Sequence, residues 1–112
     1  MVNNIRVTEF FLKKAKRLVK KYHSLENSIN KLQQDLIKNP RQGDSYGSNI
    51  YKIRLADESK GKGKSGGFRV VTYLIQQNKE STNIYLITIF DKSEEASIDK
   101  KDILEIIKTI RD

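Results

Sequence analysis

Cysteine is absent from this 112-residue sequence, and proline and histidine each occur once. Without cysteine the chain forms no disulfide, no iron–sulfur cluster and no thiolate zinc site. No apolar run approaches the roughly 18 residues of a membrane span, and the N-terminal residues "MVNNIRVTEF" lack the apolar stretch of a signal peptide. We therefore expect a cytoplasmic protein with no membrane partner.

Acidic residues are too few to balance the basic ones. The chain has 22 Lys and Arg against 14 Asp and Glu, a net charge of +8, and its apolar fraction is 37%. A small protein this basic commonly meets polyanions, because charge of one sign steers acidic partners towards it. The length and apolar fraction suit one modest core, so we expect a single domain over residues 1–112.

Apolar residues at helical spacing predict two helices early in the chain. The first follows Thr8 and the second follows Ser24, both residue types that favour the N-cap position. Pro40 and Gly43 prevent the second helix from continuing. The apolar stripes consist of Phe11, Ala15, Leu18 and Tyr22 in the first helix and of Leu25, Ile29, Leu32 and Leu36 in the second.

From residue 50 the apolar period changes to two, which predicts strands. In "IYKIRL" the tyrosine, the second isoleucine and the leucine face one way, whereas Lys52 and Arg54 form a cationic face. The segments 68–76 and 84–90 are apolar on both faces, as in central strands, and the polar turn between them predicts a hairpin.

A strand at 4–7 precedes the helices, and a closing helix is predicted after Asp99, with Ile103, Ile107 and Ile110 as its apolar stripe. The order is thus strand, two helices, three strands and helix. This order predicts an α+β fold with helices packed on a largely antiparallel sheet.

The stretch "KGKGKSGGFRVV" at residues 60–71 is the most unusual part of the sequence. Its "GKS" resembles the end of a nucleotide-binding P-loop, but Glu58 stands where that motif requires glycine, and a strand follows in place of a helix. Lys60, Lys62 and Lys64 alternate with glycines and could lay ammonium groups along a nucleic-acid backbone. A solvated hairpin loop would explain the same composition.

Four further cations favour anion binding at this end of the sheet. Adjacent antiparallel strands can bring Lys52, Arg54, Arg69 and Lys92 onto one surface. Like charges gathered in this way repel one another unless an anion joins them. The sequence therefore predicts a cationic surface that binds nucleic-acid phosphates.

Histidines and clustered carboxylates, the residues that most often cleave nucleic acids, are scarce in this sequence. His23, the only imidazole, stands at a helix end, where it interacts with the helix dipole more readily than it catalyses. The basic strip offers only Asp57 and Glu58 as carboxylates, so we expect no metal site. Any chemistry here must rely on lysine and arginine, which stabilise charge on a phosphorane.

Two further groups of residues leave alternatives open. The cations of the first helix form a solvated face or a second contact with RNA phosphates. The tyrosines near the strands stack on bases or pack against the core. These groups are Lys13, Lys14, Lys16, Arg17, Lys20 and Lys21, and Tyr46, Tyr51, Tyr73 and Tyr85.

The segments "YKIRLA", "KGKGKSGGFRVV" and "IYLITIFDKSE" and the closing helix resemble the RelE/HigB family of bacterial toxins from type II toxin–antitoxin modules. The resemblance extends over essentially the whole chain and is most specific at residues 51–71. It implies a similar fold and a ribosome-dependent mRNA endonuclease that needs no cofactor. Such an enzyme cleaves the codon in the ribosomal A site through attack of the 2′-hydroxyl, and a cognate antitoxin neutralises it.

The resemblance also implies roles for individual residues. Lys52 and Arg54 match the basic strand positions that activate the attacking hydroxyl and hold phosphate, and Arg69 matches the arginine that stabilises the transition state. Lys92 falls where RelE has an arginine that supports the leaving group. Ile98 departs from the family pattern, because RelE has a base-stacking tyrosine near this position.

Two rival functions are compatible with these residues. A ParE-like inhibitor of DNA gyrase has a related fold and binds a protein without cutting RNA. A non-catalytic basic module that binds RNA or an antitoxin would also explain the charge and the lack of the stacking tyrosine.

Overall fold

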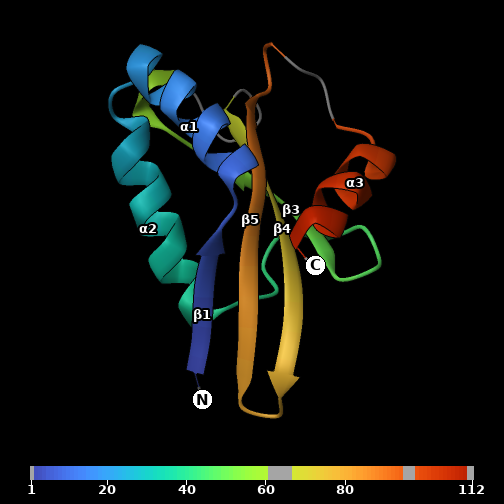
Figure 1. Ribbon diagram of the computed structural model, residues 1–112. Helices are drawn as coiled ribbons and strands as arrows, with labels where there is room; N and C mark the ends of the chain where they lie inside the picture. Colours follow the sequence, from blue (N-terminus) through green and yellow to red (C-terminus); the bar gives the residue numbers. More distant parts are fainter. Residues whose placement is uncertain (1, 61–66, 95–97, 111–112) are drawn as a thin grey trace.

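The computed structural model describes residues 2–60, 67–94 and 98–110 and has the predicted α+β architecture (Figure 1). Within these ranges, no helix is long and apolar enough to cross a membrane. The elements are β1 (Val2–Val7), α1 (Glu9–Lys21), α2 (Leu25–Lys38), β2 (Asp44–Ser45), β3 (Ile50–Leu55), a 3₁₀ turn (Glu58–Lys60), β4 (Phe68–Asn78), β5 (Ser81–Asp91) and α3 (Lys100–Ile110).

The five strands form one sheet in the order β1-β5-β4-β3-β2. The predicted hairpin is confirmed: β4 and β5 pair antiparallel and form the long central ribbon of the sheet (Figure 1). β3 pairs antiparallel with β4, whereas β1 pairs parallel with β5, with Val7 opposite Leu86. The short β2 was not predicted, because two residues are too few to show a period.

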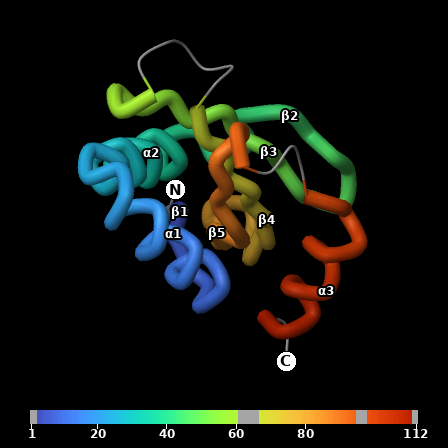
Figure 2. Tube along the Cα trace, turned by 90° about the horizontal axis from the view of Figure 1, so that it is seen from above, coloured from blue at the N-terminus to red at the C-terminus, as the bar shows by residue number. Residues whose placement is uncertain are grey.

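The helices cover both faces of the sheet. Seen along the strands, α1 and α2 lie on one side of the β4–β5 ribbon and α3 lies on the other (Figure 2). The α1–α2 side contains the larger core, built around Phe11, Leu18 and Phe68. The α3 side contains a smaller core, in which Ile103 and Ile107 pack against Val71 and Phe90. The predicted stripes of all three helices therefore face the sheet.

The predicted caps of α1 and α2 differ in outcome. Thr8 caps α1 as predicted: its hydroxyl oxygen accepts from the Phe11 N–H at 3.1 Å, and the hydroxyl donates to the Leu86 carbonyl at 2.9 Å. Ser24 stands at the N-cap position of α2, but its side chain makes no capping hydrogen bond. Its hydroxyl donates instead to the carboxylate of Asp57 at 2.7 Å. The Ser24 hydroxyl, which we expected to cap α2, is therefore bound to the buried carboxylate of Asp57, just after β3.

Candidate active site

Arg54 and Arg69 lie directly opposite each other on β3 and β4. Residues in such positions have Cβ atoms about 5 Å apart, so the stems of the two guanidinium groups stand side by side. Arg54 is exposed, whereas Arg69 is only 7% exposed and donates to the Phe68 carbonyl at 3.2 Å. Phe90 of β5 is the next residue in this row across the sheet. The structure therefore brings two of the four predicted catalytic cations together.

Lys52 lies two residues before Arg54 and hence on the same face of β3. Its ammonium stands 4.5 Å from the centre of the Tyr46 ring and 6.0 Å from that of Phe90. A hollow of about 360 Å³ opens beside Lys52 and Arg54. It is lined by Gln42, Gly43, Asp44, Lys52, Ile53 and Arg54.

Tyr46 is the candidate tyrosine whose ring lies against the Lys52 ammonium. It is 41% exposed, and the ammonium lies over the ring. Tyr73 is 7% exposed and its ring lies 6.4 Å from that of Tyr85, next to the smaller core, while Tyr51 packs against the larger core. Nothing in the sequence could single out Tyr46, because the turn that places it joins the unpredicted β2 to β3.

Lys92 directly follows β5, and the main chain ties it to the start of β4. Its N–H donates to the Gly67 carbonyl at 3.1 Å. A Cβ on Gly67 would lie 2.6 Å from the Leu55 carbonyl oxygen, so a larger residue would push this crossing apart. The ends of β3 and β5 and the start of β4 therefore meet here, and the backbone of Lys92 lies near that of Arg69.

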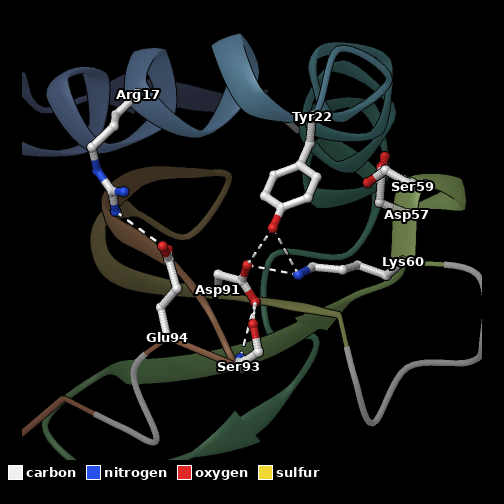
Figure 3. Close-up of polar contacts among 8 residues, drawn as sticks. All are labelled: Arg17, Tyr22, Asp57, Ser59, Lys60, Asp91, Ser93 and Glu94. Carbon is white, nitrogen blue, oxygen red and sulfur yellow. Dashed lines mark hydrogen bonds and ion pairs between the residues drawn. The ribbon is translucent and has the colours of Figure 1, made fainter.

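The Lys60 side chain points towards Tyr22 and Asp91 (Figure 3). Its ammonium lies 2.7 Å from Asp91 Oδ2 and 3.1 Å from the Tyr22 hydroxyl, and its side chain is 13% exposed. The same ammonium lies 4.4 Å from the centre of the Tyr22 ring. The predicted contact of Lys60 with RNA stays a prediction, and Lys62 and Lys64 lie outside the described residues.

Asp91 is fully buried and accepts hydrogen bonds on both carboxylate oxygens (Figure 3). Oδ2 accepts from Lys60 and from the Tyr22 hydroxyl at 3.1 Å, and Oδ1 accepts from the Ser93 N–H at 2.9 Å and hydroxyl at 2.8 Å. Burial alone would raise the pKa of Asp91, but the bonds from Lys60, Ser93 and Tyr22 outweigh it and lower the pKa to about 2. Burial likewise acts to lower the pKa of Lys60, and its bond to Asp91 more than offsets this, so that pKa is raised.

Asp57 bonds to the start of α2 and does not face the cationic row, which consists of Lys52, Arg54 and Arg69. It is 8% exposed and accepts hydrogen bonds from the hydroxyls of Ser24, Ser28 and Ser59. Burial would raise its pKa, but these bonds dominate and hold the pKa below its usual 3.8. Across residues 2–60, 67–94 and 98–110, no three His, Cys, Asp or Glu side chains are grouped so that they could hold a metal ion.

The remaining sequence candidates lie at other positions on the molecule. His23 is exposed just beyond the end of α1, and the basic residues of α1 are exposed except for the half-buried Lys14. Arg17 of α1 forms an ion pair with Glu94, at 3.6 Å, behind the end of β5 (Figure 3). Ile98 is half-buried and packs with the smaller core.

The fold and the cationic row define a small basic α+β protein with two arginines paired across β3 and β4. Residues 4–111 match the family model of the RelE toxin of the RelE/RelB toxin–antitoxin system. The chain is also similar to a structure of the E. coli toxin RelE, a mutant in the free state. The TM-score is 0.62 at 23% sequence identity, over 98% of this chain and 99% of the E. coli chain, a likeness that shows the fold.

The chain therefore belongs to the RelE family of toxins from toxin–antitoxin systems. The family implies an antitoxin as its partner.

Proposed function

We propose that this toxin is a metal-independent endoribonuclease that cleaves mRNA in the A site of the ribosome. The direct pairing of Arg54 with Arg69, on a face that also bears Lys52, carries this proposal. Like charges directly opposite each other on a sheet are destabilising, and a bound phosphate would turn their repulsion into attraction. The site would thus be most favourable with RNA in place.

The proposed reaction is a transesterification within the RNA. The 2′-oxygen attacks the adjacent phosphorus, the bond from phosphorus to the 5′-oxygen breaks, and the products are a 2′,3′-cyclic phosphate and a 5′-hydroxyl. Lys52, as the neutral amine, takes the proton of the attacking hydroxyl, and the guanidinium of Arg54 holds the phosphate. Arg69 stabilises the charge that develops on the non-bridging oxygens, and Lys92 supports the departing 5′-oxygen with charge or a proton.

Tyr46 supplies an aromatic surface for the RNA base in this proposal. It is 41% exposed and stands beside Lys52. Stacking of a base on an aromatic side chain stabilises a complex by about 1–3 kcal/mol and tolerates different bases. Ile98 offers no comparable ring, so base contacts would fall to Tyr46.

The proposed partners are the ribosome with its mRNA and a cognate antitoxin, all in the cytoplasm. A codon held in the A site is single-stranded and exposes its backbone, which suits a compact group of cations. Lys62 and Lys64 would add contacts to the RNA backbone.

The first experiment is a reconstituted translation reaction in which mRNA 5′ ends are mapped by primer extension with and without ribosomes. The wild-type protein should cut at A-site codons when ribosomes are present and leave free mRNA intact. Arg69→Ala should slow cleavage by roughly 100-fold or more, the usual effect of removing one donor to a developing charge. Arg69→Lys keeps the charge but not the two-pronged donor, and should restore activity only in part.

Arg6→Ala is the matched control, because Arg6 is an exposed arginine on β1, away from the cationic row. Circular dichroism shows whether each variant folds. Full activity of a folded Arg69→Ala protein would refute the role proposed for this residue. Intact mRNA together with gyrase-dependent DNA breaks would favour the gyrase-inhibitor function, and binding to ribosomes without cleavage would favour the non-catalytic module.

A further inference from the structure

We infer that Asp91 is a positioning residue for Lys92, held in place by Lys60 and Tyr22. The inference rests on the proposed function, in which Lys92 supports the leaving group. It also gives Lys60 an internal role in place of a direct contact with RNA.

The two carboxylate oxygens of Asp91 face different partners. Oδ2 is held by the ammonium of Lys60 at 2.7 Å and the hydroxyl of Tyr22 at 3.1 Å, which belong to the 3₁₀ turn and to the end of α1. Oδ1 accepts from the N–H and hydroxyl of Ser93, which follows Lys92. The carboxylate therefore joins the rigid body of the protein to the turn that carries Lys92.

The backbone around Lys92 is fixed by further bonds. The Glu94 N–H donates to the Asp91 carbonyl at 3.0 Å, which closes the turn, and the Lys92 N–H donates to Gly67 at 3.1 Å. Phe68, the partner of Asp91 in the β4–β5 ladder, directly precedes Arg69. A shift of Asp91 would consequently move Lys92 relative to Arg69.

A structural role alone explains this arrangement poorly. Asp91 is 0% exposed and the Lys60 side chain 13% exposed, so both charges lose most of their hydration. Replacing a whole buried ion pair by well-packed apolar side chains of similar size often stabilises a fold as well or better, so stability alone does not call for this pair. The ion pair fixes the orientation of the Asp91 carboxylate, because charge-assisted hydrogen bonds hold their partners at defined distances and angles.

The test uses the leaving group itself. In RNA whose scissile 5′-oxygen is replaced by sulfur, the departing thiolate is a stable anion that needs little help from a cation. Cleavage is measured in single turnover on programmed ribosomes with saturating toxin. On ordinary RNA, Asp91→Asn should slow the reaction by roughly 10- to 100-fold, since small misplacements of a catalytic group have effects of this size.

On the sulfur-substituted RNA, Asp91→Asn and Lys92→Ala should both recover to near the wild-type rate, whereas Arg69→Ala should stay slow. The double variant with Asp91→Asn and Lys92→Ala should be no slower than Lys92→Ala alone, because residues that act through one another are not additive. Tyr22→Phe removes one hydroxyl donor and keeps the ring, so it should show a smaller defect of the same kind.

Asp57→Asn is the matched control. Asp57 is also a buried carboxylate with hydroxyl partners and contacts the same 3₁₀ turn through Ser59, but none of its hydrogen bonds reaches residues 91–94. It should lower stability and leave the cleavage rate of the folded protein within about 2-fold of wild type.

Two results would separate the inference from the proposed function. If wild-type protein leaves ribosome-bound mRNA intact, the proposed function fails. If wild type cleaves but Asp91→Asn is equally slow on both RNAs, matches Asp57→Asn, or slows the Lys92→Ala variant further, then Asp91 does not act through Lys92. Only the inference is overturned in that case.

Discussion

The carboxylate of Asp91 should govern how this protein responds to acid. Its pKa falls from an ordinary 3.8 to about 2 in the folded protein. Because each tenfold change in proton affinity corresponds to about 1.4 kcal/mol, this difference contributes about 2 kcal/mol to the free energy of unfolding. The unfolded chain binds more protons in this range, so the contribution is complete above about pH 5 and is lost as the pH falls towards 2.

Asp91→Asn tests this reasoning. At pH 7 the variant should be less stable by about 2–4 kcal/mol, because Lys60 is left as a buried charge with weaker partners. Between pH 5 and pH 2 it should lose about 2 kcal/mol less stability than the wild type, because residue 91 can no longer be protonated. Asp57 still titrates, so the acid sensitivity should shrink and not vanish.

Urea unfolding followed by circular dichroism at pH 7, 5, 4, 3 and 2 would measure these free energies. Glu80→Gln is the control, because it removes one carboxylate from the exposed turn between β4 and β5. Its stability at pH 7 should stay within about 0.5 kcal/mol of wild type. Equal acid-induced losses in the wild type and Asp91→Asn would refute the argument that hydrogen bonds to Asp91 stabilise the folded state.

Further predictions concern Gly43, which lines the hollow beside Lys52 and Arg54, and Tyr46, whose ring lies beside the Lys52 ammonium. Gly43 has a φ of +97°, and a Cβ there would lie 2.6 Å from the Lys52 carbonyl oxygen. Gly43→Ala should therefore lower the free energy of unfolding, measured in urea, by roughly 1–3 kcal/mol, and it should slow RNA cleavage. An unchanged unfolding midpoint would contradict this. Tyr46→Leu should weaken RNA binding by about 1–3 kcal/mol in a half-saturation measurement, while Tyr46→Phe should bind like the wild type. Equal binding by both variants would exclude stacking.

The helices and central strands could be predicted because their signals are local. The apolar stripe of α1 and the alternation in β3 depend only on the period at which each backbone turns its side chains. Lys52 and Arg54 could be placed on one face of β3 for the same reason. The short β2 and the parallel pairing of β1 with β5 were missed, because they depend on contacts between segments far apart in the chain.

The candidate site was only partly predictable. The sequence indicated which cations could gather, but the register that sets Arg54 opposite Arg69 depends on how β3 and β4 align. Tyr46 carried no distinguishing signal, because its place beside Lys52 comes from the turn between β2 and β3. Asp91 looked like an ordinary residue at the end of a strand.

The sequence by itself determined the element types, the excess of basic charge and the family of this protein, because periodicity, composition and motif spacing are properties of the chain. Only the tertiary structure decided that the Lys60 ammonium points inwards and that Arg54 stands opposite Arg69. Lys60 belongs to a stretch of evenly spaced lysines, yet its ammonium meets Asp91 and Tyr22 inside the protein. A buried carboxylate needs a cation within hydrogen-bonding distance, and the packing of α1, β5 and the 3₁₀ turn brings Lys60 to that distance from Asp91.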